Sequence, residues 1–483
     1  YVSPIVESCQ KNHIVLLTDG APTWHDSQTT AMYNKWSGGT CSGSNSGRDC
    51  ALKIAGFLQT QDQAPWLTGK QTVQTHAIGF DYNSDFLRSL AANGNGEYIT
   101  ANNRQSLLEA LDKIASAVLK TNATFVSAGV TVSQYNRLTN TDELYFSIFE
   151  PSDTATWPGN VKRYKLYVEK YLDENNEEQS REYIHDRNGE LAVSTSTGEF
   201  TEKAFSYWSP TVDGNEVTKG GVASQLGVGR TIYTNIDTGS AITSISNRVR
   251  VDNALITNQK LGTLTDDERE AVLNWAQGYD VDGADKTLPH NILGDPLHSQ
   301  PALLAYADGN GDVESALFVG TNHGYLHAFD PDEDAGNELW AFVPEEHLEN
   351  LKKARDNTTA VPHFYGIDGS ASIYHDDVNG NRVVDNGEKA ALYIGMRRGG
   401  SFYYAFDISE RLNPKLMFKI DPSAQGFDNL GQTWSTPVLG KMKINGVNSS
   451  DLVMIFGGGY DVTQDVAGLP SKQDSIGNRV YIA

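Results

Sequence analysis

The sequence predicts a multidomain protein in which a partial α/β domain precedes a predominantly β region containing a truncated β-propeller. Strand-like and helix-like stretches alternate over residues 1–119, whereas short strand-like runs separated by polar turns follow from residue 120. Groups of short strands repeat most clearly over residues 290–483, and repeated four-stranded units are typical of propeller blades. A chain of 483 residues has room for two or three domains.

The first predicted domain opens with a continuous apolar run that ends in Thr18-Asp19-Gly20. Such a strand is typical of a parallel sheet covered by helices on both faces. The pattern then predicts, in order, a helix at 51–59, a strand at 73–80, a helix at 85–92, a strand at 96–99 and a helix at 106–119. This alternation predicts the α/β class.

The β region begins with strand-like runs at 125–132, 143–149, 160–169, 182–184 and 230–234. The acidic run 173–177 is interpreted as a solvated hairpin tip, because charged runs usually face water. Thr265 is predicted to cap a helix over 265–277, with Glu268 three residues later completing a capping box.

Three copies of a strand pattern follow this helix. The runs 316–320, 324–330 and 338–342 have counterparts at 391–395, 402–407 and 415–418, and a third copy spans 452–459 and 478–482. Each copy follows a short strand that carries Ser with Pro or Ala. Loops of unequal length are inserted between the strands, and in a propeller such loops gather where partners bind.

One inserted loop has the spacing of a calcium site. Asp377, Asn379, Asn381 and Asp385 stand at positions 1, 3, 5 and 9 of this loop, and Val383 at position 7 can offer its backbone carbonyl. Position 12 holds Glu388, a further candidate ligand. Ca²⁺ takes about six to eight oxygen ligands, which a tightly turning segment of this kind can supply. The alternative is a solvated turn rich in Asn, Asp and Gly that binds no ion.

The flanks of the loop argue against a helix-loop-helix calcium hand. Residues 373–374 and 391–394 are rich in β-branched and aromatic residues, so we expect the loop to close a β-hairpin. Arg382 occupies position 6, where a helical hand requires Gly. The clusters 308–314 and 280–285 space oxygens similarly, and each is either a weaker cation site or a plain turn.

The charge balance limits the partners. Lys and Arg number 38 against 61 Asp and Glu, which gives a net charge of -23. Nucleic acid and anionic membranes are therefore disfavoured, whereas cation binding fits. No run of 18 apolar residues occurs, so we do not expect an integral membrane protein. The two ends read as the middle of a longer protein.

Only three cysteines occur, Cys9, Cys41 and Cys50. A short polar loop separates the last two, so we expect a Cys41–Cys50 disulfide in an oxidising compartment, with free thiols as the alternative. Cys9 is then expected either to pair with a cysteine in a segment outside this sequence or to carry a reactive thiol.

Three phrases in the first domain, HIVLLTDGAPT, THAIGF and GEYITANNRQSLLEALDKI, resemble the second half of a von Willebrand factor A domain. In that family the Asp of the Thr-Asp-Gly turn contributes to a metal-ion-dependent adhesion site. The resemblance assigns this role to Asp19, although the accompanying Asp-x-Ser-x-Ser element is absent from the sequence. The alternative is a turn or cap residue.

The phrases GDPLHSQPALLAY, VGTNHGYLHAFD, WAFVPEEHL, GSFYYAFDIS, TWSTPVLG and GGGYD resemble the C-terminal domain of PilC/PilY proteins, adhesins of the type IV pilus tip. TWPGNVKRYKL and the von Willebrand phrases fit the same layout. The resemblance implies a calcium-binding adhesin that supports pilus extension and retraction and attachment to host cells or abiotic surfaces. It implies pilins as partners, export through the periplasm to the pilus tip or outer membrane, and Ca²⁺ held by the loop ligands Asp377, Asn379, Asn381, Val383 and Asp385.

Two other functions remain open. A quinoprotein dehydrogenase carries an Ala-x-Asp, Gly and Trp pattern in its blades, which Ala328, Asp330, Gly336 and Trp340 match in one copy only. A purely structural pilus cap is the other alternative. No catalytic motif is present, so we expect no enzyme. His298 and Ser299 are neighbours on a strand and point to opposite faces, which argues against a catalytic pair.

Overall fold

The structure, a computed structural model, describes residues 3–6, 12–20, 31, 33–35, 46–67, 69–108, 110–111, 113–114, 125–127, 142–172, 178–195, 200–310, 312–331, 336–444, 447–448, 452–465 and 474–483. It divides into two compact units. The first comprises Tyr1–Ala123 and Thr195–Gly198, and the second comprises Thr124–Ser194 and Glu199–Ala483. The domain limits expected from the sequence, 1–119 and 120–483, stay a prediction.

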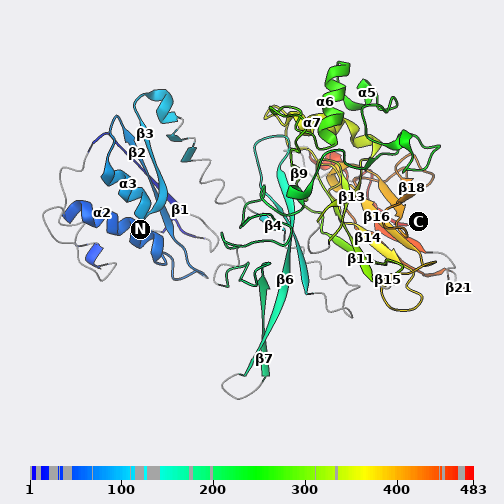
Figure 1. Cartoon of the computed structure of the whole chain (residues 1–483), viewed down its shortest axis with the longest axis horizontal. Coiled ribbons are helices and arrows are strands. Elements are labelled where there is room, and N and C mark those ends of the chain that lie inside the picture. Colours follow the sequence, from blue (N-terminus) through cyan, green and yellow to red (C-terminus); the bar gives the residue numbers. More distant parts are fainter. Residues whose placement is uncertain are drawn as a thin grey trace. The chain divides into compact units, whose positions relative to one another are not determined.

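The first unit contains a parallel sheet with strand order β1-β2-β3. Its elements are β1 (Asn12–Thr18), α2 (Ser46–Thr60), β2 (Val73–Phe80), α3 (Asp85–Asn93) and β3 (Asn95–Ala101). Strands and helices alternate as the sequence predicts (Figure 1). The von Willebrand assignment of this unit stays a prediction.

The strands of this sheet differ in burial. Ala77 and Ile78 of β2 are fully buried, because α3 packs on one side of the strand and Ala101 and Ile114 on the other. Ile14 and Leu17 of β1 are 43% and 50% exposed. The prediction that this apolar run is covered on both faces is therefore wrong for β1 among the described residues. The described helices α2 and α3 pack on β2, and among the described residues the main neighbour of β1 is β2.

The second unit begins with an antiparallel sheet. Its strands are β4 (Phe125–Ser127), β5 (Glu143–Phe149), β6 (Pro158–Leu172) and β7 (Glu178–His185), and β9 (Leu293–Gly294) pairs with the start of β6. Large side chains such as Phe146, Tyr164 and Phe200 form a core on one face of this sheet. The far ends of β6 and β7 project from it as a two-stranded ribbon (Figure 1).

Three further sheets carry the sequence repeat. The first contains the antiparallel strands β10 (Ala302–Ala307), β11 (Val313–Gly320), β12 (Leu326–Phe329) and β13 (Glu338–Phe342), with β8 (Ile232–Tyr233) and β15 (Val383–Val384) added in parallel at its edges. The second contains β14 (Ser372–His375), β16 (Ala390–Gly395), β17 (Tyr403–Asp407) and β18 (Lys415–Ile420). The third contains β19 (Val438–Gly440), β22 (Val453–Gly457) and β23 (Val480–Ile482), near the short pair β20 (Lys443–Ile444) and β21 (Val447–Asn448).

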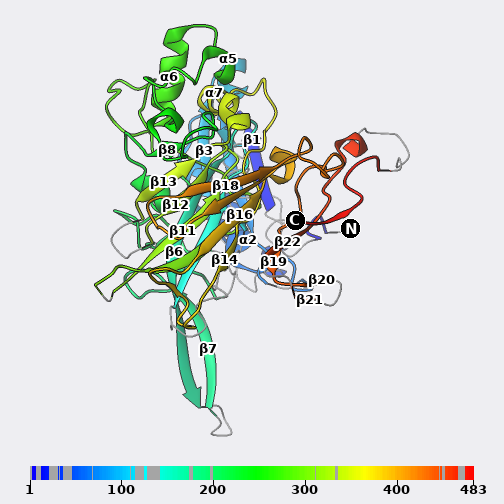
Figure 2. The same ribbon diagram turned by 90° about the vertical axis from the view of Figure 1, so that its right-hand side faces the viewer.

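The first two of these sheets match in detail. Each has a register shift in its third strand, after Ala328 and after Ala405, and these residues face Trp340 and Phe418. The sheets share one apolar core and lie side by side (Figure 2). The predicted repeat is therefore confirmed as strands. None of the sheets in the described residues closes on itself, so the propeller stays a prediction.

Short helices complete the second unit. They are α5 (Asn258–Leu261), α6 (Asp266–Ala276), α7 (Leu348–Asp356) and the 3₁₀ turns Val222–Gln225, Ile245–Asn247, Glu345–His347, Arg397–Gly399 and Val462–Asp465. Thr265 caps α6 as predicted, since its hydroxyl accepts from the N–H of Glu268 at 3.2 Å. The return bond differs from a capping box, because the Glu268 carboxylate accepts from the N–H of Leu264 at 2.7 Å. In the described part of the chain, no helix has the length and apolar character needed to cross a bilayer.

Candidate metal centre

The loop with calcium spacing closes a β-hairpin, as the flanks predict. Strands β14 and β16 pair antiparallel up to His375 and Ala390. The N–H of Asp376 donates to the carbonyl of Lys389 at 2.8 Å and closes the neck of the loop. Residues 377–388 are therefore held at both ends by one ladder of hydrogen bonds.

Side-chain oxygens organise the first half of the loop. Asp377 accepts from the N–H of Arg382 at 3.1 Å, Asn379 from that of Asn381 at 2.9 Å, and Asn381 from that of Val383 at 2.8 Å. Arg382 adopts φ 64°, a left-handed conformation that a residue with a Cβ rarely takes. Position 6 thus has the turn that Gly provides in a helical hand, here with arginine.

The predicted ligands converge on Asp385. One carboxylate oxygen of Asp385 accepts from the side-chain amides of Asn379 at 2.5 Å and Asn381 at 2.8 Å. The oxygens of both amides accept the backbone N–H bonds described above, so the amide nitrogens rather than the oxygens face Asp385. The loop therefore gathers three of the predicted ligands at one place.

Asp377 belongs to a second cluster of potential ligand atoms. His375, Asp377 and Glu388 each place one ligand atom within 4.8 Å of the others, and the described residues contain no other such group of three. One carboxylate oxygen of Asp377 is buried and accepts no hydrogen bond. An unsatisfied buried acceptor costs about 1–3 kcal/mol, which a bound cation would offset. This oxygen is the best sign that the residues fit an ion.

Glu388 turns back into the loop. Its carboxylate accepts from the N–H groups of Asp385 at 3.1 Å and Val378 at 2.9 Å. The Asp385 N–H, with smaller contributions from His375 and Val378, holds the pKa of Glu388 below its usual range. The carboxylate is therefore charged at neutral pH and anchored to both halves of the loop.

His375 is a site residue that the spacing argument missed. Its side chain is fully buried, and its Nε2 lies 3.0 Å from a carboxylate oxygen of Glu388. Ca²⁺ favours oxygen ligands, so His375 suits the role of positioning Glu388 better than that of a ligand. The available signal was a histidine at the end of the strand, two residues before the first ligand.

The loop also reaches a second sheet. Val383 and Val384 form β15, which pairs in parallel with Ala305 and Tyr306 of β10. Val384 is 4% exposed and belongs to the core that the first two repeat sheets share. The segment between the predicted ligands Asn381 and Asp385 is thus fixed to the neighbouring sheet.

The structure gives less geometric support to the other predicted sites. Asp19 follows β1 and is exposed, so its adhesion-site role stays a prediction. Cys50 is buried and disulfide-bonded, whereas Cys9 and Cys41 lie outside the described residues, and the Cys41–Cys50 pairing stays a prediction. In cluster 308–314, Asp308 accepts from the N–H groups of Asn310 and Asp312, the pattern of a turn.

His298 and Ser299 have separate partners. The Nδ1 of His298 lies 2.7 Å from Asp368, and the buried hydroxyl of Ser299 accepts from the N–H of Gly320 at 2.8 Å. Each residue ties a loop or strand to its neighbour, and the two side chains do not form a pair.

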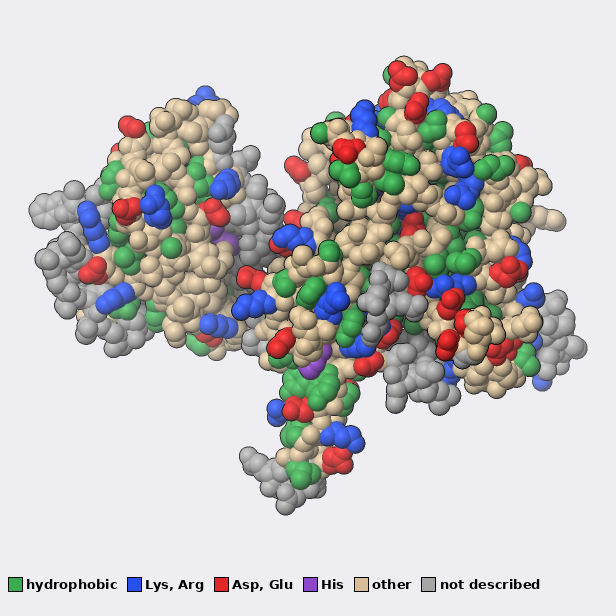
Figure 3. All heavy atoms as spheres, in the orientation of Figure 1, with side chains coloured by type: hydrophobic (Ala, Val, Ile, Leu, Met, Phe, Trp, Pro, Cys, Tyr) green, Lys and Arg blue, Asp and Glu red, His purple; other side chains and the backbone are tan. Residues whose placement is uncertain are grey.

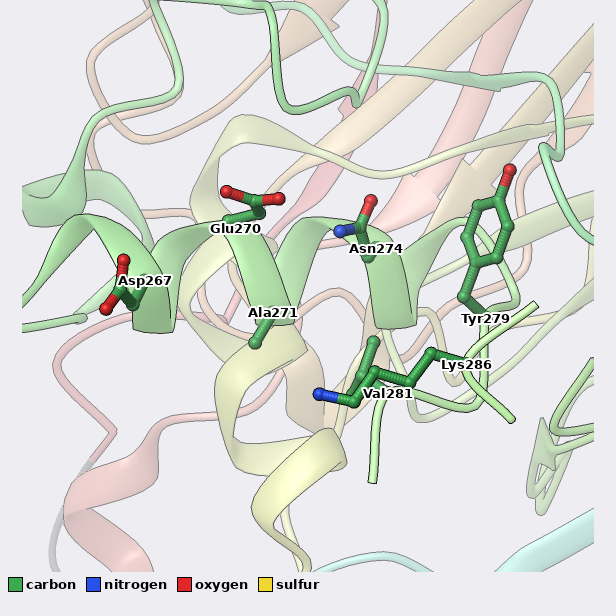
Figure 4. A pocket seen from close by; sticks show the side chains of 7 residues that line it. All are labelled: Asp267, Glu270, Ala271, Asn274, Tyr279, Val281 and Lys286. Atoms are coloured by element: carbon green, nitrogen blue, oxygen red, sulfur yellow. The ribbon is translucent and has the colours of Figure 1, made fainter. Parts of the chain in front are cut away.

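A cavity of about 420 Å³ opens beside α6 (Figure 4). Its lining combines acidic, basic, polar and apolar side chains: Asp267, Glu270, Ala271, Asn274, Tyr279, Val281 and Lys286. This mixture does not select a class of ligand, so the loop remains the candidate site.

Comparison with known proteins bears on part of the chain, up to 78% of it. No protein-family model matches it. It is 26% identical over 202 residues to the type IV pilus biogenesis factor PilY1 of Pseudomonas aeruginosa PAO1, which is 37% of this chain and 16% of that protein. With PilY1 of strain UCBPP-PA14 the identity is 23% over 407 residues, 78% of this chain and 30% of that protein. A PilY1 homolog of Xylella fastidiosa is 27% identical over 37% of this chain and 15% of its own length.

The crystal structure of the Pseudomonas aeruginosa PilY1 C-terminal domain is 26% identical and covers 30% of this chain and 25% of that chain, with a TM-score of 0.22. The curated relatives are PilY1 type IV pilus biogenesis factors, which confirms the resemblance to the PilC/PilY family. The chain spans less than a third of the length of these relatives.

Proposed function

We propose that this chain is the calcium-binding part of a type IV pilus biogenesis factor that acts as an adhesin at the pilus tip. The similarity to PilY1 proteins supports the link to pilus biogenesis. The buried, unpartnered oxygen of Asp377 is the observation that carries the calcium assignment. The proposal covers the activity and partners of the whole protein, of which the chain is a part.

The ligands are Asp377, Asn379, Asn381, the Val383 carbonyl and Asp385, with Glu388 as a further ligand. These groups suit Ca²⁺ because it is a hard cation that prefers carboxylate, amide and carbonyl oxygens. The ion supplies positive charge to a loop that carries Asp376, Asp377, Asp385 and Glu388 against Arg382 and Lys389. Its role is to fix the shape of this loop, and with it β15, rather than to catalyse a reaction.

The architecture proposed for this function is a von Willebrand factor A-like unit followed by a propeller. The parallel β1-β2-β3 sheet with its helices supports the first assignment, and the matching registers of two repeat sheets support the second. A disulfide at Cys50 fits export to an oxidising compartment, and hence the periplasm and cell surface. The partners are pilins and a host or abiotic surface.

The quinoprotein alternative has less support. Its blade pattern needs a tryptophan in each repeat, and the position of Trp340 is occupied by Phe418 in the next sheet. Trp340 itself is buried in the shared core, and its indole N–H donates to the carbonyl of Arg411 at 3.1 Å. A structural cap without adhesive function differs from the proposal only in surface attachment.

The test is genetic and uses matched carboxylates. In a bacterium that carries this protein, deletion of the gene should abolish surface pili, and the wild-type gene should restore them together with attachment to glass and host cells. Asp385→Asn should restore neither fully, whereas Asp376→Asn should behave as wild type because Asp376 lies outside the ligand set. Normal piliation in the deletion strain would contradict the biogenesis role, and normal attachment by Asp385→Asn would contradict the calcium role.

A further inference from the structure

Lys162 and Asp213 form an ion pair inside the second unit, and neither residue belongs to the candidate metal centre. The Lys162 Nζ lies 2.9 Å from the Asp213 Oδ2, and both side chains are 0% exposed. Figure 3 shows charged side chains spread over the face of the molecule that it draws, where water solvates them. In the described part of the chain, Lys162 is the only buried lysine. Taking both charges out of water is costly, so this pair calls for a physical explanation.

Strand β6 directs Lys162 into an apolar core. Asn160, Lys162 and Tyr164 alternate along β6 and therefore share one face of the sheet. Phe146 of β5 is the cross-strand partner of Lys162, and Phe146 and Tyr164 both belong to the core. Burial in these surroundings lowers the pKa of Lys162, although the Asp213 carboxylate opposes this shift. The surroundings thus favour the uncharged amine, which is the form of lysine that acts as a nucleophile.

Two backbone carbonyls fix the direction of the amine. The Lys162 Nζ donates to the carbonyl of Asp213 at 3.2 Å and to that of Gly214 at 3.1 Å. Its third contact is the Asp213 carboxylate. When the ammonium transfers this third proton to Oδ2, two N–H groups stay engaged and the lone pair faces the carboxyl group. Lys162 is therefore held as a nucleophile directed at its neighbour.

Ser206 holds both oxygens of the Asp213 carboxyl group. The N–H of Ser206 donates to Oδ1 at 2.8 Å, and its hydroxyl donates to Oδ2 at 2.8 Å. An N–H at Oδ1 stabilises the negative charge that develops there when a nucleophile attacks Cγ, as in an oxyanion hole. The hydroxyl can both accept and donate a proton, and it lies at the same oxygen that Lys162 contacts. Oδ2 is therefore the oxygen that is equipped to leave.

The loop that carries Asp213 packs closely around the pair. Gly220 has φ 61°, and a Cβ on it would lie 2.5 Å from the Asp213 Oδ2 and 2.3 Å from the Ser209 Oγ. Asn160 ties the same loop to β6, because its side-chain amide donates to the carbonyls of Val217 at 2.8 Å and Gly220 at 2.9 Å. Close packing keeps bulk water from the carboxyl group, which favours amide formation over the reverse hydrolysis.

We propose that Lys162 and Asp213 condense to an isopeptide bond, a side-chain amide that joins β6 to the loop over 206–221. The Nζ lone pair of Lys162 attacks Cγ of Asp213, and the new C–N bond moves an electron pair onto Oδ1, where the Ser206 N–H stabilises it. Return of this electron pair breaks the Cγ–Oδ2 bond. Oδ2 leaves as water with two protons, the one transferred at the start and one from Nζ that the Ser206 hydroxyl relays. The ammonium and the carboxylate thus become one amide and one water, without an oxidant or a cofactor.

This bond would close a loop between residues that are 51 positions apart in the chain. A cross-link of this length stabilises a fold mainly by restricting the unfolded chain. Because the bond is an amide, it persists in a reductant that would break a disulfide. The inference does not depend on the proposed function, since both reacting groups belong to this chain.

Intact-mass spectrometry of the reduced and denatured 483-residue chain tests the proposal. The wild type should have a mass about 18 Da below that of its sequence, which is the mass of one water. A tryptic digest should contain a branched peptide that joins residues 138–163 to 204–219, because trypsin does not cleave after an acylated lysine. Lys162→Arg is the matched control, since it keeps the positive charge but carries a guanidinium that stays protonated and does not attack. It should have the full mass of its sequence.

Ser206→Ala tests the chemistry of the step. It keeps the backbone N–H at Oδ1 but removes the hydroxyl that relays the proton, so the linked fraction should rise at least about tenfold more slowly during cell-free synthesis. Equal rates in Ser206→Ala and the wild type would overturn the relay.

Three results would overturn the bond itself. Full mass in the wild type would mean that Lys162 and Asp213 form an ion pair only. A mass loss that persists in Lys162→Arg would place the dehydration elsewhere in the chain. A branched peptide that joins other residues would assign the bond to another pair.

Discussion

Two extensions of β-hairpins can be compared: residues 377–388, called the metal loop, and the ribbon of residues 166–172 of β6 and 178–184 of β7, called the arm. Both contain acidic residues. The loop returns to the protein, where β15 pairs with a second sheet and backbone N–H groups engage Glu388. The arm instead extends as two strands that pair with each other. The two hairpins therefore differ in whether the chain folds back, and in the loop this return brings the candidate ligand atoms close together.

The largest difference in the free energy of unfolding is expected between substitutions of two valines. Val384 of the loop is 4% exposed and Val168 of the arm is 47% exposed. Val384→Asp should lower the free energy of unfolding by about 3 kcal/mol or more, because it buries an unpaired charge in the shared core. Val168→Asp should change it by less than about 0.5 kcal/mol, because the side chain faces water. Urea unfolding followed by tryptophan fluorescence measures both free-energy changes. Equal effects of the two substitutions would contradict the expected difference between the loop and the arm.

Acidification should lower the free energy of unfolding of the sheets that contain the buried histidines more than that of the arm. Burial lowers the pKa of His290, His327 and His347, and it lowers that of His323 to about 3. Because these folded-state pKa values lie below the unfolded value, the associated stability is present above about pH 6.5 and is lost as pH falls. Each extra proton bound on unfolding steepens the loss by about 1.4 kcal/mol per pH unit.

Urea midpoints at pH 7.5 and pH 5.0 measure this dependence. His323→Phe should reduce the difference between the two midpoints, because it removes one buried group that protonates on unfolding. Tyr183→Phe, on β7 of the arm, serves as the control and should leave the difference unchanged, because it removes no histidine. A His323→Phe protein with the full pH dependence would show that His323 contributes nothing to it.

Substitutions of two glutamates test a smaller effect, which concerns amide hydrogen exchange in the loop. Glu388→Gln weakens the acceptor for the N–H groups of Val378 and Asp385, so exchange at these two amides should become several-fold faster. Glu169→Gln in the arm is the matched change and should leave the loop amides unaffected. Hydrogen exchange resolved by NMR provides the measurement, and unchanged rates in Glu388→Gln would refute its anchoring role.

Local patterns predicted much of the fold. The apolar runs of β2, β11, β12, β16 and β17, the cap at Thr265 and the hairpin around the metal loop depend on residues close together in the sequence. The exposure of β1 was not predictable in this way, because it depends on which elements pack on the faces of the sheet. The projection of β6 and β7 likewise depends on where β5 ends.

The candidate site was predictable only in part. Spacing predicted Asp377, Asn379, Asn381, Val383, Asp385 and Glu388 as candidate ligands, because such a pattern is local in the sequence; their role as ligands stays a prediction. It missed His375, whose role comes from its contact with Glu388 across the hairpin. It also missed β15, because the pairing of Val383 with Ala305 joins residues far apart in the chain through a strand of only two residues.

Calorimetric titration with Ca²⁺ tests the central claim most directly. The wild-type chain should bind calcium, and Asp377→Asn and Asp385→Asn should each weaken binding by about tenfold or more, because each removes a charged ligand. Asp376→Asn makes the same charge change beside the site and should retain wild-type affinity. Equal affinity in all four proteins, or no heat of binding in the wild type, would contradict the account.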